Sequence, residues 1–174
     1  MNDLKSYVRD IPHFPKQGII FKDITTLLKN GKKFKEAVDL FAEEVKGKKI
    51  DAILCVEARG FIFGSALAYR LGTGIAPIRK KGKLPYKTYS ITYDLEYGKD
   101  TLEIHQDAFE KGAHVLIVDD LLATGGTSRA VIDLVEKMGG KIEGLIFLIE
   151  LTVLKGREKL KGYPVTSLIK DEYC

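Results

Sequence analysis

Residues 115–127 constrain the fold of this chain more than any other stretch of the sequence. Four apolar residues lead into Asp119 and Asp120, and a Gly-Gly pair flanked by threonines follows. Apolar residues then recur at helical spacing over residues 127–138. A buried strand, a tight turn and a helix in this order are typical of a βαβ unit, in which ligands bind at the carboxyl end of the strand.

Strand and helix patterns alternate along the rest of the chain. Apolar runs predict strands at residues 51–56, 74–78, 114–118, 142–151 and 165–169. Helices are predicted at residues 33–45, 60–71, 127–138 and 153–160. Residues 89–103 alternate more weakly around Gly98 and predict a hairpin or a flexible excursion. We therefore expect an α/β fold with a central, mostly parallel sheet that helices cover on both faces.

The composition is that of a single globular domain. The chain has 174 residues, 45% of them hydrophobic and 30% charged, without an internal repeat or linker. No apolar run reaches the roughly 18 residues that span a bilayer, and the N-terminus lacks the apolar stretch of a signal peptide. Cys55 and Cys174 form neither a CxxC pair nor a metal-binding cluster with histidine. We expect a cytoplasmic protein with no membrane partner, in which Cys55 is buried.

The positive charge is concentrated in one short segment. The net charge is only +4, too small to indicate a nucleic-acid partner. Residues 79–87 nevertheless contain five basic side chains and no acid: Arg79, Lys80, Lys81, Lys83 and Lys87. Taken alone, this segment fits an anion site, a solvated charged loop or a nucleic-acid patch. The segment has no interleaved aromatic platform on which single-stranded nucleic acid could stack, so we expect no nucleic-acid partner.

The turn after the long apolar run has the chemistry of a sugar-phosphate site. Its glycines let the backbone approach a ligand closely, and the amides at the start of the next helix can bind phosphate together with the hydroxyls of Thr124, Thr127 and Ser128. Asp119 and Asp120 would repel phosphate but accept hydrogen bonds from adjacent sugar hydroxyls. Walker A and GxGxxG patterns are absent. We predict a ribose 5-phosphate site; the alternative is a pair of acids that cap a helix beside an ordinary glycine turn.

This run resembles the signature with which type I phosphoribosyltransferases bind 5-phosphoribosyl 1-pyrophosphate (PRPP). Further segments resemble the adenine-using members of that family: residues 11–24 their N-terminal hood, residues 56–64 their pyrophosphate loop, and residues 79–85, 95–98 and 102–104 their flexible catalytic loop. Residues 150–157 also resemble the family. One position varies: this chain has Glu57-Ala58 in the pyrophosphate loop, where other members of the family have Asp-Ser. The resemblance implies the type I phosphoribosyltransferase fold in one domain over residues 1–174. The hood would occupy about residues 1–30 and the flexible loop about residues 80–100.

The resemblance also implies roles for matching residues. Asp119 and Asp120 would bind the ribose hydroxyls of PRPP. The turn would hold the 5-phosphate through Ala123, Thr124, Gly125, Gly126 and Thr127. The pyrophosphate would lie against a loop with a cis peptide bond at Glu57-Ala58 and against basic side chains: Glu57, Ala58, Arg59, Gly60, Arg79, Lys80 and Lys83. Phe21 would stack on adenine near Arg59, and backbone groups around Ile20 would bind the base edge.

The implied activity is the purine-salvage reaction in which adenine and PRPP give AMP and pyrophosphate. Glu96 would exchange a proton with the purine, and Tyr97 would cover the reacting centre. Arg59 would be the third catalytic residue, with its guanidinium near the base and the pyrophosphate. Mg²⁺ would be held mainly by PRPP and water, with no direct protein ligand. In a homodimer, the position of Arg79 and Lys80 would help complete the partner's site.

Other interpretations remain open at the level of sequence. Without the resemblance, Phe21 is better explained as a core aromatic residue, Glu57 and Arg59 as a surface ion pair, and Glu96 as an exposed charge. The nearer alternative function is a phosphoribosyltransferase for another purine, such as xanthine or hypoxanthine. The more distant one is a PRPP-sensing regulator without catalysis.

Overall fold

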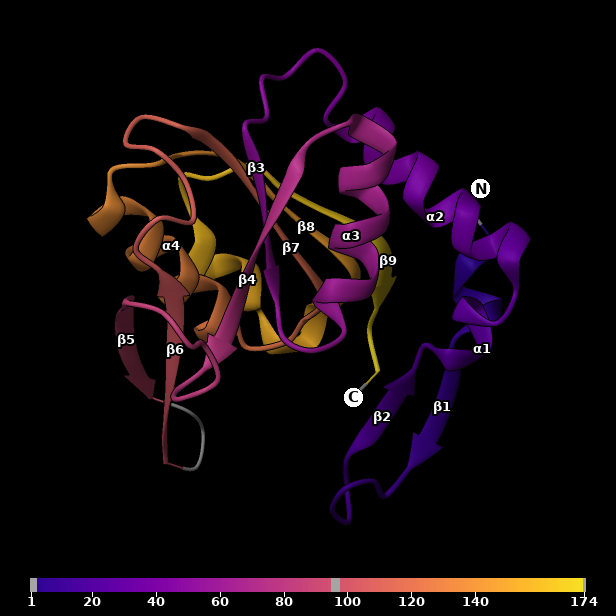
Figure 1. The fold of residues 1–174 in the computed structure, drawn as a ribbon. Helices are drawn as coiled ribbons and strands as arrows, with labels where there is room; N and C mark the ends of the chain where they lie inside the picture. Colours follow the sequence, from indigo (N-terminus) through magenta and orange to yellow (C-terminus); the bar gives the residue numbers. More distant parts are fainter. Residues whose placement is uncertain (1–2, 95–97, 174) are drawn as a thin grey trace.

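The computed structural model describes residues 3–94 and 98–173 and is built around a seven-stranded sheet (Figure 1). The strands are β3 (Ala52–Val56), β4 (Gly74–Lys80), β5 (Thr88–Asp94), β6 (Lys99–His105), β7 (His114–Leu122), β8 (Lys141–Leu151) and β9 (Val165–Asp171). Their order across the sheet is β5-β6-β4-β3-β7-β8-β9. Neighbours from β4 to β9 run parallel, whereas β5 and β6 form an antiparallel hairpin on β4. The predicted α/β fold with a mostly parallel sheet is therefore confirmed.

Helices cover both faces of this sheet. Figure 1 shows α2 (Gly31–Glu44) and α3 (Gly60–Leu71) on one side and α4 (Gly126–Met138) on the other. Side chains of β3 alternate between the two apolar layers: Leu54 packs on the α4 side, and Ile53 and Cys55 pack on the side of α2 and α3. All five residues of β3 are buried, which explains why a continuous apolar run marked this strand. Burial raises the pKa of the Cys55 thiol to about 12.

A small hairpin stands beside the main sheet in the stretch predicted as the hood. It begins with the 3₁₀ segment η1 (Asp3–Tyr7), continues through β1 (Arg9–Pro12) and β2 (Ile20–Asp23), and leads into the single-turn helix α1 (Thr25–Leu28). Within the described part of the chain, β1 and β2 pair only with each other, with Ile11 opposite Phe21. The hairpin projects away from the sheet near the end of β9 (Figure 1).

Two segments differ from the sequence-based expectation. Residues 153–160 do not form one helix but two 3₁₀ segments, η2 (Thr152–Leu154) and η3 (Gly156–Leu160), because Lys155 between them has a positive φ of 52°. Strand β7 continues to Leu122 rather than ending at residue 118, because β8 pairs with it as far as Leu122. Its other neighbour, β3, pairs with it only up to Val118, so Asp119 and Asp120 lie where that neighbour has ended.

The structure contains no helix, among the residues it describes, that is long and apolar enough to cross a membrane.

Candidate active site

A cavity of about 350 Å³ opens at the carboxyl ends of β3, β4 and β7. Parallel α/β sheets bind ligands at this edge. The residues that line it are Val56, Glu57, Ala58, Arg59, Lys80, Tyr93, Asp100, Leu102, Asp119, Asp120, Leu121 and Thr127. The cavity therefore brings together residues that the sequence assigned separately to pyrophosphate, ribose and phosphate.

The predicted phosphate turn joins β7 to α4. Gly125 has a φ of +77° and stands at the N-terminus of α4, where no side chain caps the helix. The first-turn amides of an uncapped helix can bind an anion. Gly156 of η3 backs the turn: a Cβ on Gly156 would lie 2.1 Å from the carbonyl oxygen of Ala123, and a Cβ on Gly125 would lie 2.4 Å from that of Gly156. Two glycine backbones thus pack in direct contact, which fixes the shape of the turn.

The two predicted ribose-binding acids lie near the end of β7, where Asp119 is partly buried and Asp120 is buried. Asp119 Oδ1 accepts a 2.9 Å hydrogen bond from the backbone amide of Asp120. Asp120 is only 5% exposed, and its Oδ2 lacks a directed hydrogen bond although Arg59 Nε lies 2.8 Å away. Burial raises the pKa of both carboxyls, most strongly that of Asp119, on which the charge of Asp120 also acts. A buried carboxylate oxygen that lacks a well-directed donor, as Asp120 Oδ2 does, is suited to accept a hydrogen bond from a sugar hydroxyl.

The loop between β3 and α3 packs against these acids. Its Glu57-Ala58 peptide bond is cis, as the resemblance implied. A Cβ on Gly60 would lie 2.9 Å from the carbonyl oxygen of Val118 and 3.0 Å from Asp119 Oδ1, so only glycine permits this approach. The contact places the backbone of the predicted pyrophosphate loop next to the predicted ribose site.

Glu57 holds the start of the basic segment. Its carboxylate accepts hydrogen bonds from Lys83 Nζ at 2.7 Å, the Lys80 amide at 2.9 Å and Arg79 Nε at 3.2 Å. Burial alone would raise the pKa of Glu57, but Lys83, the Lys80 amide and Arg79 together bring that pKa below its ordinary value. The ammonium of Lys80 lies 3.1 Å from Asp100 Oδ2, which raises the pKa of Lys80. Basic side chains and their acidic partners therefore border the cavity.

Arg59 connects the hairpin to the acids. Its guanidinium carbon lies 5.0 Å from the centroid of the Phe21 ring, while its Nε reaches Asp120. Phe14 meets Phe21 edge to face at 5.2 Å. Phe21 is only half-buried and belongs to neither apolar layer, so its interpretation as a core aromatic residue is wrong. Ile20, next to it on β2, is also partly exposed.

Several residues of the site were not found from the sequence. Tyr93 donates or accepts a 3.1 Å hydrogen bond between its hydroxyl and Thr127 Oγ1, and burial raises the pKa of Tyr93. Asp100 pairs with Lys80, and Gly156 packs against the phosphate turn. Nothing in the local sequence pattern indicates that Asp100 or Gly156 belongs to the site. Resemblance of residues 150–157 to the family was the one available signal for Gly156. Glu96 and Tyr97 lie outside the described residues.

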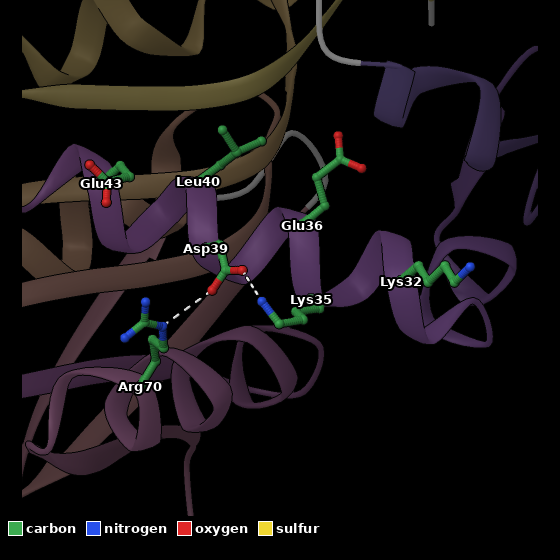
Figure 2. A pocket seen from close by; sticks show the side chains of 7 residues that line it. All are labelled: Lys32, Lys35, Glu36, Asp39, Leu40, Glu43 and Arg70. Carbon is green, nitrogen blue, oxygen red and sulfur yellow. Dashed lines mark hydrogen bonds and ion pairs between the residues drawn. The ribbon is translucent and has the colours of Figure 1, made fainter.

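A second hollow lies between α2 and α3 and contains none of the predicted site residues (Figure 2). It is lined by Lys32, Lys35, Glu36, Asp39, Leu40, Glu43 and Arg70. Asp39 pairs there with Lys35 and, at 3.2 Å, with Arg70. These opposite charges neutralise one another, as on an ordinary solvated helix surface. Within the described part of the chain, no three acidic, histidine or cysteine side chains are grouped so that they could hold a metal ion.

Comparison with known proteins identifies the class. Residues 23–171 match the phosphoribosyl transferase domain family, and the chain belongs to this family, with the fold of its type I members. Its relatives include the adenine phosphoribosyltransferase of Syntrophotalea carbinolica, which is 61% identical over 98% of this chain and 99% of its own length. The crystal structure of the Thermoanaerobacter pseudethanolicus adenine phosphoribosyltransferase is similar with a TM-score of 0.94 and 56% identity, over 97% of this chain and 98% of the other.

A solved structure of the Saccharomyces cerevisiae adenine phosphoribosyltransferase was obtained in complex with an imino-altritol bisphosphate and adenine. It resembles this chain with a TM-score of 0.90 and 42% identity, over 95% of this chain and 96% of the yeast chain.

Proposed function

We propose that this chain transfers the 5-phosphoribosyl group of PRPP to adenine, which gives AMP and pyrophosphate in a pentosyltransferase reaction of purine salvage. The observation that carries the proposal is the Asp119–Asp120 pair beside the phosphate turn, in which Asp120 is buried and its Oδ2 faces Arg59 without a directed hydrogen bond. A sugar that bears a vicinal diol and a 5-phosphate supplies the hydroxyl donors and the anion that these two neighbouring features accept. The near-full-length similarity to adenine phosphoribosyltransferases supports adenine as the base.

The phosphoribosyl group is held from two sides. We assign its 2′- and 3′-hydroxyls to Asp119 and Asp120. The 5-phosphate is assigned to the turn from Ala123 to Thr127, where the uncapped N-terminus of α4 and the Thr127 hydroxyl support anion binding. Holding both ends of the sugar orients C1′ and lowers the entropic part of the barrier.

The leaving pyrophosphate is assigned to the loop Glu57, Ala58, Arg59 and Gly60 and to the basic segment. The C1′–oxygen bond breaks with its electron pair on pyrophosphate, so negative charge grows there. Arg79 and Lys83 are held next to the cavity by Glu57, and Lys80 lines it, which supports their role in neutralising that charge. The same charges bind PRPP before the bond breaks.

Adenine is assigned to the space beside Phe21, with Arg59 nearby and backbone groups around Ile20 at the base edge. The N9 lone pair forms the new bond to C1′ from the face opposite pyrophosphate, so the configuration at C1′ inverts. The purine loses one ring proton as the N9–C1′ bond forms, and Glu96 is assigned to accept it. Tyr97 covers the reacting centre, and both assignments rest on the family resemblance. Exclusion of water limits hydrolysis of PRPP.

The carboxylates around the cavity are compatible with Mg²⁺ that binds as a complex with PRPP. It commonly binds through substrate phosphates and water with few protein ligands. Glu57, Asp100 and Asp120 are already paired with basic side chains, which supports an ion held mainly by PRPP and water rather than by the protein. When bound, the ion would neutralise part of the charge on pyrophosphate.

A homodimer is also part of the proposal. The outer surface of α3 and the start of β4 expose large apolar side chains, namely Ile62, Tyr69, Leu71 and Ile75. Tyr69 is 91% exposed, which supports a surface that a second copy covers. We also propose that Arg79 and Lys80 help complete the partner's site. A cytoplasmic location agrees with the buried free thiol of Cys55.

Competition among adenine, hypoxanthine and xanthine tests the proposed base. The purified chain is incubated with PRPP, Mg²⁺ and all three purines at equal concentration, and the nucleotide products are separated by chromatography. We expect AMP as the dominant product. Inosine or xanthosine monophosphate at a comparable rate would establish the alternative purine enzyme, and nucleic-acid binding without turnover would establish the regulator.

A further inference from the structure

The β1–β2 hairpin has almost no buried surface of its own. Across its two strands, Lys22 is the one residue that is buried, and the others are exposed or partly exposed. The Lys22 side chain is 2% exposed, and its ammonium lies 2.8 Å from Asp171 Oδ2 at the end of β9. Asp171 is buried as well, with 6% of its side chain exposed. A charged pair therefore stands where a hairpin would ordinarily place apolar side chains.

We propose that the Lys22–Asp171 ion pair is a positioning element of the base site: it fixes the hairpin to the end of β9 and thereby sets the place of Phe21. The inference deepens the proposed function and rests on it, since it gives Phe21 its role toward adenine.

The geometry of β2 links the ion pair to the site. Adjacent residues of a strand point to opposite faces, so Lys22 and Phe21 project to opposite sides of β2. Lys22 reaches the end of β9 on one side, and the Phe21 ring reaches the guanidinium of Arg59 at 5.0 Å on the other. Movement of Lys22 relative to Asp171 consequently moves Phe21 relative to Arg59 and the acids behind it.

Asp171 is itself held from several directions. Its Oδ1 accepts the Tyr173 backbone amide at 3.1 Å and lies 3.4 Å from Lys5 Nζ of η1. Its carbonyl oxygen accepts a 3.1 Å hydrogen bond from the Thr152 hydroxyl at the start of η2. The carboxylate is thus a fixed point on the main body of the protein to which the hairpin attaches.

Both members of the pair remain charged. Burial alone would lower the pKa of Lys22, but hydrogen bonds and charge attraction from Asp171 and Asp10 raise it above its ordinary value. Burial would likewise raise the pKa of Asp171, but Lys22 and the Tyr173 amide lower it. Asp10, on the neighbouring strand, lies 3.0 Å from Lys22 and is half-exposed. A buried ion pair is often no more stabilising than apolar residues, which favours a role in geometry over one in stability.

Steady-state kinetics of Lys22→Met test the inference, with KM for adenine, KM for PRPP and kcat measured separately. Because the displaced ring would no longer meet the base, we expect KM for adenine to rise by about tenfold or more and KM for PRPP to change by less than about twofold. Lys22→Arg, which keeps the charge, should recover most of the affinity for adenine. Arg9→Met is the matched control, since Arg9 pairs with Asp23 within the same hairpin but is 56% exposed.

The outcomes separate this inference from the proposed function. Wild-type protein without adenine turnover rejects the proposed function, and the inference falls with it. Normal wild-type turnover with an unchanged KM for adenine in Lys22→Met, or an equal rise in both KM values, overturns the inference alone. If Lys22→Met does not fold, Asp171→Asn replaces it, with the same selective rise expected. Failure of both variants to fold would make the pair a general requirement of the fold and would also overturn the inference.

Discussion

Replacement of Gly156 by alanine should damage PRPP binding although Gly156 touches no predicted ligand. The new Cβ would lie 2.1 Å from the carbonyl oxygen of Ala123 and 2.9 Å from the amide nitrogen of Gly125, and both are backbone atoms. Ordinary contact begins at 3.4 Å, so the Ala123 carbonyl would have to retreat by about 1.3 Å, the difference between 3.4 and 2.1 Å. A misplacement of about 1 Å at a reacting group can cost about 100-fold in rate, or about 2.7 kcal/mol.

Two measurements check this expectation. Steady-state kinetics should show kcat/KM for PRPP reduced by about 100-fold, and thermal unfolding should show that the variant is folded. Gly31→Ala is the control, because a Cβ on Gly31 would meet no atom within 4 Å. Activity within about twofold of wild type in a folded Gly156→Ala variant would refute the idea that η3 shapes the phosphate turn.

Three further variants test other parts of the site. Phe21→Ala should raise KM for adenine by roughly tenfold to a hundredfold, since stacking contributes about 1–3 kcal/mol per base, and an effect confined to PRPP would contradict stacking. Glu96→Gln should lower kcat by about 10²–10⁴-fold with little change in substrate binding, and normal turnover would leave Glu96 a surface charge. Glu57 has a lowered pKa when folded, so its stabilisation is complete above its ordinary value of 4.5 and is lost as pH falls through the folded value. Glu57→Gln should remove about 1 kcal/mol of stability above pH 4.5 and little at lower pH, because Arg79 and Lys83 are partly exposed; melting curves that shift equally at every pH would argue against these ion pairs.

Local patterns in the sequence were sufficient for the elements that form the two apolar layers. The unbroken apolar run of β3 predicted a strand buried on both faces, and the predicted bounds of the helix at residues 60–71 agree with α3. The pattern at residues 153–160 misled because apolar spacing does not distinguish one helix from two 3₁₀ segments. The positive φ of Lys155 interrupts the helix there. Because position 155 is a lysine rather than a glycine or proline, the residue type did not predict the interruption.

Contacts between distant residues could not be read from the sequence. Glu57 pairs with Arg79 and Lys83, and Lys22 pairs with Asp171, only because the sheet and the hairpin bring them together. The extension of β7 through Asp119 depends on pairing with β8, a partner that an isolated strand pattern cannot reveal. The site residues that the sequence did supply came from the turn at residues 115–127 and from family resemblance, not from these long-range contacts.

We assign the ribose of PRPP to the two acids near the end of β7, Asp119 and Asp120. Titration calorimetry tests this assignment by comparing PRPP binding, in the presence of Mg²⁺, to wild-type protein and to the double variant Asp119→Asn with Asp120→Asn. Hydrogen bonds to charged groups contribute about 1.5–3 kcal/mol, so we predict an affinity for PRPP lower by about tenfold or more per carboxylate. The variant should remain folded, since it replaces two acids whose pKa values are raised by burial and whose charged forms the fold therefore disfavours. An unchanged affinity for PRPP in the folded double variant would show that these acids do not hold the ribose.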